Sequence, residues 1–162
     1  MAAMQQGKID AGMTTEPTIS QVTGKGLGKV LVDLRTPEAT RAALGGDYPF
    51  ISVFMTSDYV NSHKDVVQRL VNAYVKTLKY ISTHTAAQIT DQMPADYYSA
   101  DKQAYITALD NQKGSFTADG RMPADGPALV NKIETSYVPS MKGTSVDLSK
   151  TFTNEFADQA NT

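Results

Sequence analysis

A long run of regularly spaced apolar residues in the middle of the chain constrains the fold most strongly. Apolar side chains recur at three- and four-residue spacing from residue 67 to residue 81, which places them on one face of a helix. We expect this helix over about 62–82, beginning at the capping-box-like pair Ser62 and Asp65. The apolar face consists of Val67, Leu70, Val71, Tyr74, Val75, Leu78 and Ile81.

Further helices are predicted after this one. A short helix is expected over about 85–92, since Pro94 ends it, and another over about 99–112, since Gly114 follows it. A last helix is expected to begin with Pro127 in its first turn and to bury Leu129, Val130, Ile133 and Tyr137.

The first third of the chain has a different pattern. Three short runs rich in branched and aromatic residues, 9–13, 29–34 and 49–56, predict strands. Short helical segments are expected around them, over about 2–8, 17–22 and 38–43. The sequence therefore predicts an α/β chain with a few short strands at the N-terminal side and a helical C-terminal part.

Composition excludes several classes of function. The chain has 162 residues, a formal net charge of −2 and no cysteine. Nucleic-acid binding through bulk charge is therefore not expected, nor are disulfides, thiolate metal sites or cysteine nucleophiles. His63 and His84 lie at opposite ends of the predicted helix, ~30 Å apart, and cannot share a metal ion. We expect no cofactor and no metal.

Two motifs resemble catalytic or phosphate-binding signatures but favour structural roles. Gly24, Gly26 and Gly28 follow a predicted helix and precede a predicted strand, the reverse of the order in a phosphate-binding loop. Ser99 and Lys102 match the S-x-x-K spacing of serine acyl enzymes, but neither S-D-N nor K-T-G follows. A helix N-cap at Ser99 is the simpler interpretation.

Two side-chain groups in the helical part also favour ordinary roles. Three aspartates fall in different helical phases, which is typical of a solvated face rather than a metal site. Two adjacent tyrosines beside a helix start are more typical of half-buried packing than of ligand stacking. These residues are Asp91, Asp96 and Asp101, and Tyr97 and Tyr98.

The strongest candidate site is the turn formed by Thr14, Thr15 and Glu16. It lies between a predicted strand and a predicted helix, where two hydroxyls and the helix amides suit an anionic group. The alternative is that Thr15 or Glu16 only caps the helix. The residues alone leave both interpretations open.

The same segment belongs to an ordered set of matches. The pattern A-x-x-x-G-x-I-D-A is present from Ala3 to Ala11, followed by Glu16 and Pro17, then K-V-L-V-D, Y-P-F-I-S-V and S-D-Y. Over about 1–140 the chain resembles the second lobe of periplasmic solute-binding proteins of the nitrate/sulfonate/taurine ABC-transporter type. Thr15 stands where that family's pattern has an aromatic residue.

The resemblance implies a partial periplasmic-binding-protein-like fold. Residues 1–48 would be the end of the second lobe, and 49–162 the return crossing and C-terminal helices. It also implies that the chain is not an enzyme, that it binds a small anion such as nitrate, a sulfonate or taurine, that it serves an ABC permease in the membrane, and that it is periplasmic or extracytoplasmic. Thr14, Thr15 and Glu16 would line the ligand cleft.

Two alternatives and two further expectations accompany this interpretation. The alternatives are a biosynthetic enzyme of the related fold, for pyrimidine- or porphyrin-type chemistry, and a ligand-sensing domain of a larger signalling protein. We also expect the chain to be a fragment that lacks the first lobe. Because the apolar helix face would then lose its cover, we expect a homodimer or larger species.

Overall fold

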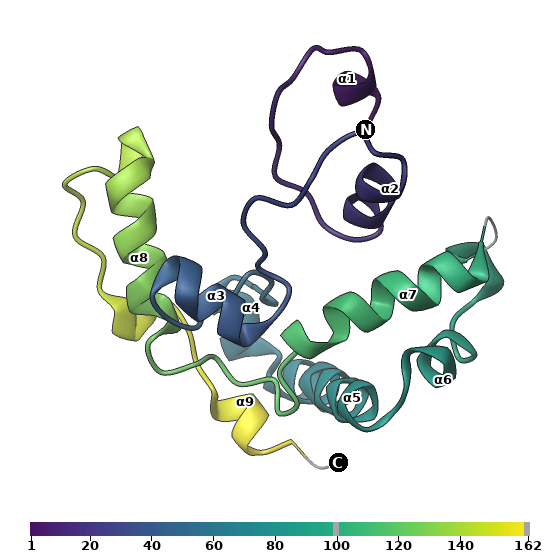
Figure 1. The fold of residues 1–162 in the computed structure, drawn as a ribbon. Coiled ribbons are helices and arrows are strands. Elements are labelled where there is room, and N and C mark those ends of the chain that lie inside the picture. The colour runs from purple at the N-terminus through teal and green to yellow at the C-terminus, as the bar shows by residue number, and fades with distance from the viewer. Residues whose placement is uncertain (99–100, 161–162) are drawn as a thin grey trace.

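The computed structural model of the chain describes residues 1–98 and 101–160, and all regular secondary structure in them is helical (Figure 1). Nine α-helices and four 3₁₀ helices are formed in these residues. The helices are α1 (Ala2–Gln5), α2 (Thr18–Gly24), α3 (Pro37–Leu44), α4 (Ser57–Ser62), α5 (Lys64–Thr83), α6 (Ala86–Thr90), η1 (Ala95–Tyr97), α7 (Lys102–Gln112), η2 (Lys113–Ser115), α8 (Gly126–Tyr137), η3 (Pro139–Met141), η4 (Leu148–Lys150) and α9 (Glu155–Asp158).

The prediction of an α/β fold with short strands is wrong. The runs 9–13, 29–34 and 49–56 contain no strand. A strand needs a second strand to satisfy its backbone groups. In the described part of the chain, residues 9–13, 29–33 and 49–55 make no backbone hydrogen bond. Their composition favours strands, but no segment pairs with them.

The predicted helix over 62–82 is confirmed as α5, which begins at Lys64, and a separate short helix, α4, precedes it. Thr56 caps α4 by accepting a hydrogen bond from the amide of Tyr59 at 3.3 Å. Ser62 ends α4, and its hydroxyl donates to the carbonyl of Asp58, so it does not begin the long helix. The backbone of His63 leaves helical geometry, with φ −135° and ψ 41°, and α5 begins at the next residue.

The later helices begin at local capping signals. Thr85 and Gln88 form a reciprocal capping box at the start of α6. Asp101 caps α7 by accepting a hydrogen bond from the amide of Ala104 at 3.0 Å. The expected cap at Ser99 lies outside the described residues. Pro127 stands in the first turn of α8, as predicted.

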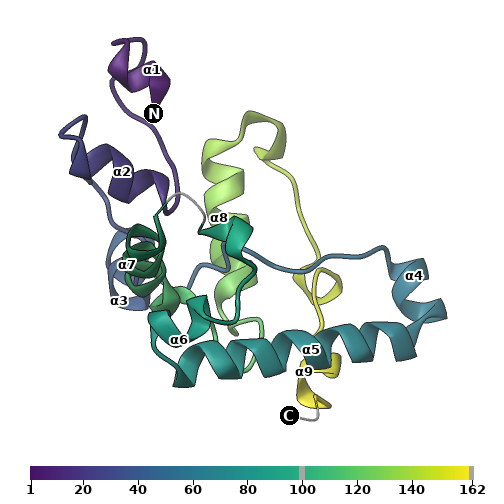
Figure 2. The same ribbon diagram turned by 90° about the vertical axis from the view of Figure 1, so that its right-hand side faces the viewer.

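The core of the molecule lies around α5, which runs along the base of the view in Figure 2. This helix contacts α4, α6, α9 and η2. Gln68 of α5 donates a hydrogen bond to the carbonyl of Phe156 at 2.9 Å and so holds α9 in place. The buried apolar side chains are Val22, Val67, Val75, Ala86, Ile89, Ala108, Leu129 and Phe156.

The predicted apolar faces are only partly covered. In α5, Val67 and Val75 are buried, whereas Leu70 and Tyr74 are exposed. In α8, Leu129 is buried, but the side chain of Tyr137 is 81% exposed because it lies at the last residue of the helix. The prediction that Tyr137 is buried is therefore wrong.

The N-terminal helices stand apart from this core. Figures 1 and 2 both show α1 and α2 at one end of the molecule, away from α5 and α9. They pack with each other through a local turn, in which the amide of Leu27 donates to the carbonyl of Val22 at 3.0 Å and Gly28 lies against Met4. In the part of the chain that the structure describes, no helix combines the length and apolar character that crossing a membrane requires.

Candidate functional site

Glu16 is the most tightly held residue of the predicted Thr14–Glu16 turn. Its Oε2 accepts a hydrogen bond from the amide of Ser20 at 3.0 Å, which satisfies one of the free amides at the start of α2. Its Oε1 accepts from Nη1 of Arg35 at 2.7 Å. The side chain is only 3% exposed. Both carboxylate oxygens of Glu16 therefore accept hydrogen bonds within the turn, while Pro17 holds the N-cap position of α2.

Arg35 is held by a second carboxylate, that of Asp33. Its Nε donates to Oδ1 of Asp33 at 3.0 Å and its Nη2 donates to Oδ2 at 2.7 Å, which is the two-point geometry that strengthens such pairs. The amide of Arg35 also donates to Oδ1 of Asp33 at 3.0 Å. We call Glu16, Asp33 and Arg35 the charge triad.

The charge triad shifts the pKa values of its members. The hydrogen bonds that the Arg35 side chain and amide donate lower the pKa of Asp33 from 3.8 to about 2. Burial alone would raise the pKa of Glu16, but the hydrogen bonds from Ser20 and Arg35 outweigh it, and the pKa lies below its ordinary value. The hydrogen bond to Asp33 raises the pKa of Arg35. All three groups are therefore charged at neutral pH, and the guanidinium compensates the buried carboxylate.

In contrast to the nearly buried Glu16 side chain, Thr14 and Thr15 lie at the surface. Both residues are exposed, and neither hydroxyl makes a hydrogen bond within the described residues. The carbonyl of Thr15 accepts from the amide of Ile19 at 3.3 Å, which fixes the backbone at this point. The structure thus brings the three predicted residues together as one anchored carboxylate and two free hydroxyls.

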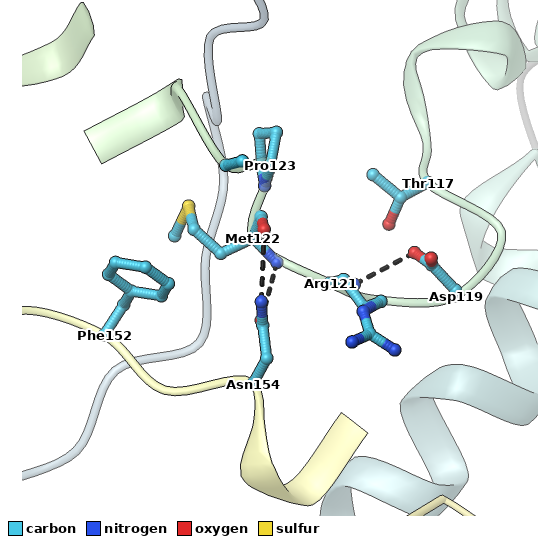
Figure 3. Close-up of a pocket in the computed structure, with 8 residues that line it drawn as sticks. Thr117, Asp119, Arg121, Met122, Pro123, Phe152 and Asn154 are labelled. Atoms are coloured by element: carbon cyan, nitrogen blue, oxygen red, sulfur yellow. Dashed lines mark hydrogen bonds between the residues drawn. The ribbon is translucent and has the colours of Figure 1, made fainter. Parts of the chain in front are cut away.

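A second candidate is an open hollow of about 660 Å³ between the loop 117–124 and the segment 152–154 (Figure 3). The side-chain amide of Asn154 holds the two together. The amide of Met122 donates to Oδ1 of Asn154 at 2.9 Å, and Nδ2 of Asn154 donates to the carbonyl of Met122 at 3.2 Å. In Figure 3, Asn154 reaches the Met122 backbone beside Phe152 and Pro123.

The polar groups of this hollow are already engaged. Oγ1 of Thr117 accepts from the amide of Gly120 at 3.1 Å, and Oδ1 of Asp119 accepts from the amide of Arg121 at 3.0 Å. The guanidinium of Arg121 pairs with Asp158 at 2.6 Å. The hollow therefore has a structural explanation as the point where α9 joins the preceding loop. Sequence reasoning missed it because the clamp spans 32 residues.

Among the remaining sequence candidates, Tyr97 is 61% exposed, so the expectation that it is half-buried is wrong, whereas Tyr98 is half-buried. Asp91 accepts a hydrogen bond from Nζ of Lys102 at 2.7 Å, and this bond raises the pKa of Lys102. The Lys102 ammonium lies 5.3 Å from the ring centre of Tyr98. His63 and His84 cap α4 and α5. In the described ranges 1–98 and 101–160, His, Cys, Asp and Glu residues form no group of three or more that could hold a metal ion.

The two histidines share one local arrangement. Their rings stack on the tyrosines four residues before them, with centroid distances of 4.4 Å for Tyr59 and His63 and 3.6 Å for Tyr80 and His84. Each Nδ1 also lies within hydrogen-bonding distance of the tyrosine carbonyl. The repeated pattern Y-x-x-S/T-H is therefore a helix-ending signal in this chain.

Comparison with known proteins gives one informative match. No known family model matches the chain, and no curated protein does. A solved structure of a protein from Bordetella bronchiseptica RB50 is similar, with a TM-score of 0.90 and 31% sequence identity. The match covers 99% of this chain and 50% of that chain, so this chain spans half the length of the Bordetella protein. This match bears on the fold and on no activity.

Proposed function

We propose that the chain is the ligand-binding part of a solute-binding component that delivers a small anion, such as nitrate, a sulfonate or taurine, to an ABC permease in the membrane. The site is the turn at Thr14 and Thr15, and the component works in the periplasm or another extracytoplasmic space. Transfer of the solute involves no covalent chemistry, so the chain is not an enzyme.

One observation carries this proposal: an anchored turn that presents two free hydroxyls. Thr14 and Thr15 are exposed, and their hydroxyls make no hydrogen bond within the described residues. Glu16 and Arg35 hold the turn through an ion pair of 2.7 Å. Because the guanidinium compensates the Glu16 carboxylate, an anion at the hydroxyls does not face a bare negative charge. Preorganised donors of this kind suit a small anion.

The same geometry argues against the enzyme alternative. A biosynthetic enzyme would need a general base or nucleophile beside the turn. Glu16 is the titratable side chain of the turn, and both of its oxygens accept hydrogen bonds from groups that fix its position. Its pKa is lowered, which makes it a weaker base.

Calorimetry on the full chain tests the proposal. Nitrate, taurine and methanesulfonate are titrated into the chain, and at least one is expected to bind. Thr15→Val should weaken that binding ~5–150-fold, because a hydroxyl that donates to a charged ligand is lost. Thr77→Val on α5 is the matched control, since its exposed hydroxyl bonds only to the carbonyl of Ala73, and it should leave affinity unchanged. Absence of binding by all three anions, or equal affinity in Thr15→Val, would contradict the proposal.

A further inference from the structure

The chain exposes more surface than a folded monomer of its mass. Its accessible surface is 11220 Å² for 17.5 kDa. Monomeric proteins of this mass expose about 7,900 Å². The excess, roughly 3,300 Å² on one chain, is larger than the ~800 Å² that each partner buries in an interface of standard size. The surface of the chain is therefore of the kind that a second polypeptide covers.

Several strongly exposed apolar side chains lie on two segments outside the helices. In the segment 49–56, Ile51 is 84% exposed and Phe54 is 93% exposed. In the segment 29–34, Leu31 is 75% exposed. Monomers rarely leave apolar patches of this kind open to water. These segments, rather than the face of α5, are the principal uncovered apolar surface.

The backbone of these segments is also unpaired. Within the described residues, 29–33 and 49–55 make no backbone hydrogen bonds. The segment 49–56 carries no charged residue and is rich in branched and aromatic side chains. Segments with free amides and carbonyls and without charge are templates for pairing with another chain.

We propose that the segment 49–56 is a homodimer interface, in which two copies of the chain pair antiparallel along this segment about a two-fold axis. A two-fold interface presents the same surface twice, so a segment without charge meets its copy without like-charge repulsion. The net charge of −2 adds little repulsion between copies.

The first test is the mass of the full chain in solution. Light scattering at micromolar concentration should give twice 17.5 kDa. The double variant Ile51→Lys/Phe54→Lys should weaken the dimer ~100-fold or more, because it places two pairs of like charges in the interface. Tyr137→Lys is the matched control, since this side chain is exposed on α8 outside the segment, and it should leave the mass unchanged. Far-UV circular dichroism must show unchanged helix content in all three proteins.

The second test uses the absence of cysteine from the chain. Ser52→Cys places one thiol in the middle of the segment, and mild oxidation should convert most of the protein to a covalent dimer. Ser136→Cys on α8, with an equally exposed position, should remain uncrosslinked. A monomeric wild-type chain overturns the proposal. So does a dimer that survives the two lysines and crosslinks equally at both cysteines, or a monomer that binds lipid vesicles through the segment.

The experiments can contradict the dimer proposal without contradicting the proposed anion site, and the reverse. The variants at Ile51 and Phe54 leave Thr14 and Thr15 unaltered, so anion binding measured on them reports the site alone. Loss of the dimer with retained anion binding would support both proposals, whereas a monomeric wild-type chain that binds an anion would overturn only the dimer.

Discussion

Residues 57–112 and residues 1–56 are of similar length but are held together differently. In the later region each of α4, α5 and α6 contacts the next α-helix along the chain. In the earlier region the connections between α1, α2 and α3 contain two stretches, residues 9–13 and 29–33, without backbone hydrogen bonds. A helix satisfies its own backbone groups, whereas an extended segment depends on a partner. Residues 57–112 therefore satisfy most of their backbone groups within their own helices, whereas residues 1–56 contain extended stretches that do not.

The two regions also differ in how polar side chains are used. In the later region, polar side chains mostly cap helices within a few residues, as the capping box of Thr85 and Gln88 does at the start of α6. In the earlier region, the charge triad connects residues 19 positions apart through the ion pair of Glu16 and Arg35. That triad is the principal polar link between α2 and the segment before α3. Removing one side chain of the charge triad should therefore destabilise the whole turn before α2.

The largest expected effect compares one substitution in the two regions. Phe156→Ala should lower the free energy of unfolding by ~3–5 kcal/mol, because Phe156 is buried between α9 and α5 and its removal leaves a cavity. Phe54→Ala should change it by less than ~0.5 kcal/mol at concentrations where the chain is monomeric, because Phe54 is exposed. Urea unfolding followed by circular dichroism measures both. Equal losses would mean that Phe54 is covered within one chain.

This contrast explains what the sequence could predict of the fold. The predicted helices over 38–43 and 85–92 and the helix beginning at Pro127 are confirmed as α3, α6 and α8, since their signals are caps and turns within a few residues. The predicted strands are wrong because strand composition does not specify a partner. The long helix predicted over 62–82 is confirmed as α5, whereas the short helix α4 before it was not predicted.

In the candidate site, too, contacts between neighbouring residues were predictable from the sequence and distant contacts were not. The turn at Thr14, Thr15 and Glu16 was identified from neighbouring residues, and the hydrogen bond from Ser20 to Glu16 is a contact within four positions. Its partner Arg35 was not predicted, because nothing local connects it to Glu16. The only available signal was the sequence Asp33-Leu34-Arg35 after an apolar run, in which a carboxylate and a guanidinium stand two residues apart.

A smaller effect is expected from removing the cation of the charge triad. Arg35→Met should lower the free energy of opening of α2 by ~2–3 kcal/mol, because the nearly buried Glu16 carboxylate loses its counter-charge. Amide hydrogen exchange should show faster exchange in α2 and unchanged exchange in α5. Arg41→Met is the control, since Arg41 forms exposed pairs with Glu38 and Asp47, and its loss should cost less than ~1 kcal/mol. Faster exchange in α5 would show that the two regions are coupled.

The smallest expected effect is the pH dependence of Asp33. Its carboxyl should titrate near pH 2 in the folded chain, against an ordinary value of 3.8, because Arg35 donates hydrogen bonds to the ionised form. Since the folded pKa is the lower one, the stabilisation is present above about pH 4 and is lost as the pH falls towards about 2. Carbon-13 NMR of the carboxyl groups measures the midpoint directly. In Arg35→Met the midpoint should return towards 3.8, while in Arg41→Met it should stay near 2. A midpoint near 4 in the wild-type chain would mean that the bidentate pair of Asp33 and Arg35 is open in solution.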